Sequence, residues 1–413
     1  MGLPDRIPDY PEKQPAPKSP QEPSTQQSDP LHNFSIVLGG PLYDSLQRHG
    51  IVQSSLPNVA RRIAALVALT WLPLLVLSLR DGVAWGHQVK VPFLYDLSMY
   101  GRFLLALPLL IIAELVIDPE IRLGVGEFLD GGFVPQSELA EFDGILREVQ
   151  RLRDSWIPET TLLILAFFPY FLVQSEWARG AISTWHTSAH GLTTAGWWFA
   201  VVSAPPLHFV IYRWAFRYFV WAMLLWRISR LHLTLVPTHP DRAGGLNFLS
   251  LVQKHFGILF CALGCAFAGR VGNALLYEAA PLASFRFLIP GFIVLAVIFG
   301  LLPLVLLAPR LLHVRKYGLL EYGRLAKSYN LSFDQKWVHC RQSPSEPLLG
   351  TSDIQSLADM GNSFKLVDDM NIAPITKRLV LQLAAQAAAP LIPIIIFATP
   401  TPELVKAVMR MVT

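Results

Sequence analysis

The sequence has little charge for its length. Only 15% of its 413 residues are Asp, Glu, Lys or Arg, whereas 52% are hydrophobic. Ordinary soluble domains carry about 25% charged residues, and a soluble chain of this length would need two or three domains with well-charged surfaces. Apolar, almost uncharged runs of about 18 or more residues recur along the chain, which is typical of membrane-spanning helices. These features exclude a soluble enzyme, a fibre and a disordered protein.

Cysteines and catalytic motifs are equally scarce. The three cysteines do not make a disulfide framework. The chain has no Walker loop, no GxSxG, no HExxH and no dinucleotide-binding fingerprint. These absences favour a protein that is not an enzyme, and we predict no cofactor and no metal site. Nucleic-acid binding is not predicted either, because the Lys and Arg residues follow membrane topology and do not form one patch.

Proline is abundant at the beginning of the chain. Residues 1–33 carry eight prolines together with Ser, Gln and mixed charge, and almost no aliphatic residues. Such a segment cannot bury enough apolar surface to offset the entropy lost on ordering. We predict a disordered cytoplasmic tail at 1–33, followed by one transmembrane helical domain at 34–413.

Seven apolar stretches predict seven membrane spans. They lie at about residues 62–79, 98–117, 157–175, 197–225, 256–278, 286–309 and 379–398. Prolines interrupt the fourth and the seventh stretch and should kink them. Small residues recur at three- or four-residue spacing in the fifth stretch and predict a packing stripe on a helix at the centre of the bundle; they are Gly257, Cys261, Cys265, Ala268 and Gly272. The cytoplasmic loops would then be 118–156, 226–255 and 310–378, with an amphipathic helix predicted at 138–153. The predicted fold class is an all-α, polytopic transmembrane bundle with a small cytoplasmic helical layer.

The distribution of positive charge predicts the orientation. With the N-terminus in the cytoplasm, 24 of the 34 Lys and Arg residues fall in cytoplasmic segments and seven in outer segments. Cytoplasmic loops carry an excess of Lys and Arg in membrane proteins. The count therefore favours a cytoplasmic N-terminus and a C-terminus on the outer side.

Polar residues at membrane depth are the main candidates for a site, because such groups usually face the bundle interior or a water-filled cavity. The candidates are Arg270 and Asn273 in the fifth span, Gln382 and Gln386 in the seventh, Glu114 in the second, and Arg213 and Arg217 in the fourth. One interpretation is that they form pairs that lock the bundle, with Arg217 as the partner of Glu114. The other is a polar pathway or an anionic ligand site around Arg270.

The segment PTHPDRAGGLNFL (237–249) is the most distinctive cytoplasmic loop. Its prolines and paired glycines force a defined turn, which presents His239, Asp241 and Arg242 together at the membrane surface. The segment is interpreted either as a rigid connector between two spans or as a contact for a ligand or partner. A third hypothesis, an enzyme acting on lipid, rests on His239 and Asp241 at headgroup depth.

Three segments carry a resemblance to known proteins. They are VPFLYD with GRFLLALPLLIIAE (91–96 and 101–114), PTHPDRAGGLNFL (237–249) and LGTSDIQSLADMGNSF (349–364). With these segments the chain resembles a group of uncharacterised multi-spanning bacterial inner-membrane proteins. The resemblance implies a location in the bacterial inner membrane. In that membrane the orientation from the charge count predicts a periplasmic C-terminus. It implies no activity, substrate or catalytic residue.

Two functional hypotheses follow from the sequence. The first is a transporter- or channel-like protein for a small, anionic solute, because polar residues lie at membrane depth and two spans are broken by proline. The alternative is a non-transporting scaffold or sensor that binds a protein partner through its cytoplasmic loops. In either case membrane lipid surrounds the protein.

Overall fold

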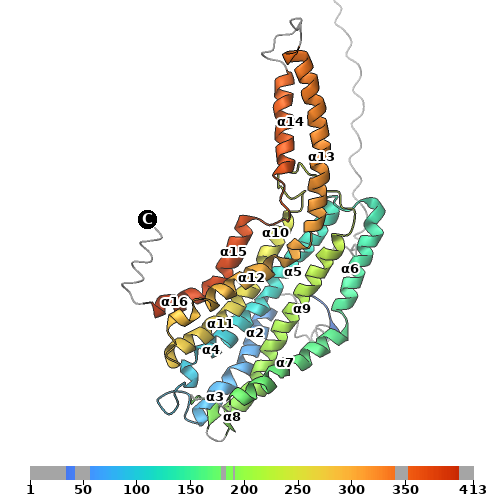
Figure 1. The fold of residues 1–413 in the computed structure, drawn as a ribbon. Helices are drawn as coiled ribbons and strands as arrows, with labels where there is room; N and C mark the ends of the chain where they lie inside the picture. The colour runs from blue at the N-terminus through green and yellow to red at the C-terminus, as the bar shows by residue number, and fades with distance from the viewer. Residues whose placement is uncertain (1–33, 42–55, 178–182, 189–190, 340–351, 400–413) are drawn as a thin grey trace, which may run out of the picture.

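A computed structural model describes residues 34–41, 56–177, 183–188, 191–339 and 352–399 of the chain (Figure 1). The predicted tail at 1–33 lies outside these residues. Within them the chain is almost entirely helical, and the only regular strands are β1 (Thr187–Ser188) and β2 (Gly191–Leu192), which form a short hairpin. The predicted all-α, polytopic fold class is confirmed.

Among the described residues, six helices are long and apolar enough to cross a membrane. They are Asn58–Arg80, Leu97–Asp130, Thr194–Ile228, Phe248–Tyr277, Leu282–Val305 and Lys377–Ala398. Six of the seven predicted spans coincide with them, and the chain is an integral membrane protein. The third predicted span, 157–175, lies on α7 (Trp156–Trp177), of which Trp156–Pro169 forms a shorter apolar helix. That α7 crosses the membrane stays a prediction.

Proline divides several of these long helices into shorter elements. A proline lacks the N–H that would bond to the preceding turn, so it is tolerated at the beginning of a helix and breaks one elsewhere. Accordingly, α3, α5, α9 and α16 each begin with a proline in the first turn. The elements of the spans are α2 (Leu56–Thr70), α3 (Leu72–Arg80), α4 (Leu97–Met99), η2 (Tyr100–Ala106), α5 (Leu107–Asp130), α8 (Thr194–Trp198), η4 (Phe199–Ser203), α9 (Ala204–Ile228), α10 (Phe248–Gln253), η5 (Lys254–Phe256), α11 (Gly257–Tyr277), η6 (Leu282–Phe285), α12 (Leu288–Val305), α15 (Lys377–Ala388), η8 (Ala389–Leu391) and α16 (Ile392–Ala398).

The helix containing α11 lies at the centre of the bundle. The most apolar window of Phe248–Tyr277 is 56% buried, against 17% to 28% for the helices of α2–α3, α12 and α15–α16. The small residues predicted to form a packing stripe on this span allow that position, because they let neighbouring backbones approach closely. A Cβ built on Gly269 would lie 2.6 Å from the carbonyl oxygen of Leu97. The predicted central position of this helix is confirmed.

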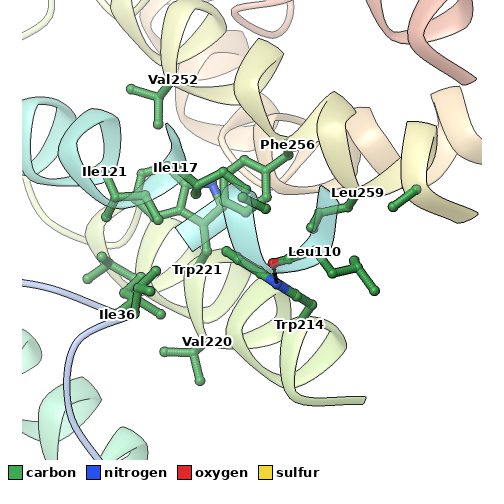
Figure 2. Close-up of a cluster of buried hydrophobic side chains, with 14 of the residues drawn as sticks. Ile36, Leu110, Ile117, Ile121, Trp214, Val220, Trp221, Val252, Phe256 and Leu259 are labelled. Atoms are coloured by element: carbon green, nitrogen blue, oxygen red, sulfur yellow. Dashed lines mark hydrogen bonds between the residues drawn. The ribbon is translucent and has the colours of Figure 1, made fainter. Parts of the chain in front are cut away.

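One end of the bundle carries α10, α13 and α14 and is called here the hairpin end; the end that carries α3 and α8 is called the far end (Figure 1). Toward the hairpin end, α5 and α9 pack with α6 (Leu139–Arg153) and α10 around aromatic side chains. Figure 2 shows part of this core, in which the Trp214 indole Nε1 donates a hydrogen bond of 2.8 Å to the carbonyl of Leu110. The predicted amphipathic helix at 138–153 corresponds to α6, which packs on α9.

A long helical hairpin extends from the bundle (Figure 1). Its arms are α13 (Ala308–Phe333) and α14 (Ser352–Asp368). The base is anchored where Gly318 packs closely against Pro237 and Val367. The helical layer predicted beside the bundle takes the form of this hairpin, in which α13 follows α12 along the chain and packs against α14.

Candidate functional site

The polar side chains inside the bundle gather at two levels. The first level surrounds Asp96 and Asn273 at the far end. The second surrounds Glu114 and Arg217, about 17 and 23 residues along the helices that begin at Leu97 and Thr194, or about 26 and 35 Å at the rise of an α-helix. A bilayer hydrocarbon core is about 30 Å thick. The two levels therefore lie about one core thickness apart.

The level on the hairpin side is a network of ion pairs. Glu114 accepts from Arg62 and from Arg217, each at 2.9 Å, and Arg213 lies 3.6 Å from Glu159. The Arg217 guanidinium also donates to the carbonyl of Val37 at 2.8 Å. The predicted pairing of Glu114 with Arg217 is present. Because these charges satisfy each other, the network joins α2, α5, α7 and α9.

The described N-terminal segment, residues 34–41, packs against this network. Residues 34–37 are almost fully buried, and the Ser35 carbonyl accepts a hydrogen bond of 2.6 Å from Arg153. The Ser35 hydroxyl donates to Asp118, which also pairs with Arg122 at 2.8 Å. Gly39 makes this path feasible, because its φ of 132° lies in the region that favours glycine. The segment ties the beginning of the described chain to α5, α6 and α9.

The far-end level is centred on the buried carboxylate of Asp96. It accepts hydrogen bonds from the Trp185 indole at 2.8 Å, the Asn273 amide at 2.6 Å and the backbone N–H of Ser98 at 2.9 Å. The Asn273 carbonyl oxygen in turn accepts from the N–H of Leu97 at 2.9 Å. Asn273 thus joins α11 to the beginning of α4 and holds the carboxylate in place.

His186 lies beside this level, in the loop before α8. Burial lowers the pKa of His186 to about 4, the nearby charge of Asp96 acts in the opposite direction, and Arg102 lowers the pKa further. The imidazole is therefore neutral at pH 7. The ring packs against Trp185 and Phe199, which gives the far end an aromatic cluster.

The predicted site around Arg270 is not assembled in the structure. The Arg270 side chain is 54% exposed and pairs with Glu278 at 2.5 Å, at the far end of α11. Gln386 packs against Gly257, near the opposite end of α11, at about 20 Å along the helix from Arg270. Gln382, one turn earlier on α15, is half-buried. The grouping of Arg270 and Asn273 with the two glutamines is therefore wrong, because α11 separates them by most of its length.

In the loop at 237–249 the structure brings His239 and Asp241 together, whereas the Arg242 guanidinium lies 3.9 Å from Asp369. The Asp241 carboxylate accepts from the N–H groups of Ala243, Gly245 and Asn247 at 2.8 to 3.1 Å. Burial raises the pKa of Asp241, but these donors outweigh it and hold the pKa below its ordinary value.

Asp241 and its neighbours hold the loop in place. His239 Nδ1 lies 2.7 Å from Asp241, and the Arg242 carbonyl accepts from the N–H of Asn371 at 2.7 Å. Because Asp241 binds the backbone of its own loop, the arrangement favours the interpretation as a rigid connector, which here anchors the base of α14.

A cavity lies between the two polar levels. It has a volume of about 310 Å³ and is lined by residues of η2, α7, η4, α9 and α11. Among the described residues that line it, Arg102 and His208 are the only charged or titratable groups. Both η2 and η4 are π-helical, a rare geometry that is frequent at functional sites. The lining is otherwise apolar, with alanines at four positions.

Arg102 was not a candidate from the sequence. In the count of positive charges Arg102 is one of the seven outer residues, because it lies only four residues after residue 98, where the second span is predicted to begin. In the structure the spanning helix begins at Leu97, so Arg102 lies about 8 Å along it. The signal in the sequence is a lone arginine within the apolar run YGRFLLALPLL. Its position inside a cavity follows only from the packing of α7 and α9.

Comparison with protein-family models, with curated proteins and with solved structures finds no match for the chain. Its function must therefore be argued from its own geometry. Among the described residues, no group of three or more His, Cys, Asp or Glu side chains is placed to hold a metal ion. The candidate site is the membrane cavity with Arg102 and His208.

Proposed function

We propose that this integral membrane protein is a transporter- or channel-like protein for a small solute, and that the solute passes through the cavity lined by Arg102 and His208. The cavity is the observation that carries the proposal. Ionisable groups at membrane depth are expensive and usually mark a pathway or a ligand site. A volume of about 310 Å³ lies at the lower end of the range of about 300 to 1,000 Å³ that is common for small-molecule pockets.

The surrounding levels complete the proposed pathway. Asp96 caps the helix Leu97–Asp130 and Arg102 and Glu114 follow along it, while His208 and Arg213 lie on the neighbouring α9. The far-end hydrogen bonds of Asp96 and the ion pairs of Glu114 lie on opposite sides of the cavity. Exchange of these bonds is the event that would admit a solute from one side and release it on the other.

Flux into proteoliposomes tests this proposal. The probes are radiolabelled chloride, acetate and benzoate, and the control is protein-free liposomes. We expect at least one probe to enter faster with the protein, and the excess to disappear in Ala204→Trp, which fills the cavity. Gly291→Trp on α12 is the matched control, because a Cβ at Gly291 meets no atom within 4 Å. Influx equal to that of protein-free liposomes for all three probes would contradict the proposal.

The proposed location and orientation rest on the distribution of positive charge. The hairpin end is proposed to face the cytoplasm of a bacterial cell, with the chain in the inner membrane. The support is the excess of Lys and Arg in the segments of the hairpin end, in agreement with the rule that cytoplasmic loops are positively charged.

The hairpin favours a second candidate function, a scaffold or sensor. Tyr317, Leu320 and Leu331 on α13 are 48% to 52% exposed, and their spacing places them on one helical face. Such a face on an extended hairpin is suited to a protein partner. Photo-cross-linking from position 331 in intact cells should then give one defined adduct. Lipid adducts alone, or none, would contradict this function.

A further inference from the structure

We infer that the cavity binds an organic monoanion with an apolar portion, such as a medium-chain or aromatic carboxylate. This assignment rests on the proposed function, because it names the substrate class of the same cavity. The two polar lining groups determine the charge of the ligand, and the walls determine its remaining chemistry.

Arg102 supplies a positive charge that lacks a partner. Among the described residues no carboxylate or hydrogen-bond acceptor contacts its guanidinium, which remains protonated in proteins. The other arginines of the bundle interior do have partners: Arg62 and Arg217 bind Glu114, and Arg213 lies beside Glu159. The charge of Asp96 influences Arg102 from the far-end level, but Trp185, Asn273 and Ser98 occupy its oxygens. An anion in the cavity would complete the pairing of Arg102.

His208 supplies a second polar contact. Among the described residues its buried Nδ1 has no hydrogen-bond partner, and its ring stacks on Tyr212 at 6.2 Å between centroids. Arg102 lines the same cavity. Among the described lining residues, the Arg102 guanidinium supplies the one permanent positive charge. The charge of the site therefore matches a monoanion better than a dianion.

The apolar walls of the cavity indicate that the ligand has an apolar portion. They are formed by Ala166, Ala200, Ala204 and Ala266, together with larger side chains such as Phe199 and Leu207. The volume of about 310 Å³ is far more than the roughly 10 to 15 Å³ that one water molecule needs by the same measure. A small inorganic anion would leave most of this apolar surface wet or empty. An aliphatic chain or an aromatic ring would remove it from water, which is favourable.

Such a ligand can reach the cavity from the aqueous side or from the bilayer. Octanoate and benzoate represent an anion delivered from water, and oleate represents an anion resident in the membrane. The shared chemistry is one carboxylate on an apolar body. Competition between octanoate and oleate distinguishes the two sources. If the ligand comes from water, oleate does not displace bound octanoate; if the ligand comes from the membrane, oleate displaces it.

Equilibrium binding of radiolabelled octanoate to the full chain in nanodiscs tests the assignment, with empty nanodiscs subtracted. We expect saturable binding, competition by benzoate, and no competition by octanamide or sulfate. Arg102→Gln should raise the Kd at least about tenfold, which corresponds to the loss of one modest ionic contact. Arg270→Gln is the matched control, because it removes an exposed arginine of the same bundle end, and it should leave the Kd unchanged.

A second variant covers the case in which Arg102→Gln fails to fold. Ala204→Trp keeps the arginine but fills the cavity, so it should also abolish binding, while Arg102→Lys should retain part of it. Equal competition by octanamide would overturn the assignment of an anion, and equal competition by sulfate would overturn the apolar portion. Unchanged binding in Ala204→Trp and in folded Arg102→Gln would overturn the site.

The outcomes also separate this assignment from the proposed function. Octanoate binding that depends on Arg102, without flux of any probe, would support the ligand class and contradict transport. Flux of chloride that Ala204→Trp blocks, without octanoate binding, would support transport and overturn the ligand class.

Discussion

At the scale of single residues, the membrane-depth arginines differ in whether they have a partner. Arg62 and Arg217 share the carboxylate of Glu114, whereas Arg102 faces a cavity. The Glu114–Arg217 pair could be predicted because both residues lie toward the cytoplasmic ends of their predicted spans. The position of Arg102 in a cavity could not be predicted, because it depends on how α7 and α9 pack against η2.

Replacing Glu114 tests the structural role of the ion-pair level. Glu114→Gln leaves Arg62 and Arg217 without a countercharge, and breaking a buried ion pair costs about 3 to 5 kcal/mol. Thermal unfolding in detergent should therefore occur at a clearly lower temperature. Glu148→Gln is the matched control, since its pair with Arg227 is exposed and such pairs contribute about 0 to 1 kcal/mol. Equal unfolding temperatures for the two variants would contradict the structural role.

His186 gives a prediction about pH. Because burial lowers its folded-state pKa to about 4 from an ordinary 6.5, the folded state favours the neutral ring. The stability from this group is complete above pH 6.5 and is lost as the pH falls from 6.5 toward 4. The unfolding temperature of the wild type should therefore fall more steeply over this interval than that of His186→Gln. Parallel pH profiles would show that His186 is not buried in its neutral form.

At the scale of the elements, the positions of the helices could be predicted from the sequence better than their internal geometry and their pairing. Apolar length predicted the positions of six spanning helices, and the small-residue stripe predicted the central place of α11. The π-helical segments η2 and η4 could not be predicted, because a change from i→i+4 to i→i+5 bonding depends on tertiary packing. The pairing of α13 with α14 also depends on tertiary contacts, which amphipathic spacing alone does not reveal.

The contact between α11 and α4 gives a prediction at this scale. In Gly269→Ala the new methyl would lie 2.6 Å from the Leu97 carbonyl oxygen, so the backbones must separate. Overpacking of this kind costs about 1 to 3 kcal/mol, and the unfolding temperature should fall. Gly291→Ala on α12, where the methyl meets no atom within 4 Å, should leave it unchanged or raise it slightly. A stable Gly269→Ala protein would show that the helices do not approach this closely.

At the scale of the whole molecule, the bundle has two chemically different ends. The hairpin end carries the ion-pair level, the connector at 237–249 and the extended helices α13 and α14. The far end carries the Asp96 network and the aromatic cluster around Trp185. Loop charge predicts which end faces the cytoplasm, whereas the internal division into two polar levels with a cavity between them emerges only from the packed structure.

Thiol labelling tests the orientation of the molecule. In a chain whose Cys261, Cys265 and Cys340 are replaced by serine, Leu331→Cys on α13 should react with an impermeant reagent only after cells are opened. Trp85→Cys, in the exposed segment after α3, should react in cells whose outer membrane alone is permeable. The reverse pattern would contradict a cytoplasmic hairpin.

The most direct test of a solute pathway is the reactivity of one position inside the cavity. Ala204→Cys in the cysteine-free chain is treated in membranes with an anionic methanethiosulfonate reagent, with Phe299→Cys on the exposed face of α12 as the control. A pathway that admits anions predicts modification at position 204, slowed by octanoate, and none at position 299, where lipid excludes the reagent. Position 204 as unreactive as position 299 would contradict a pathway through this cavity.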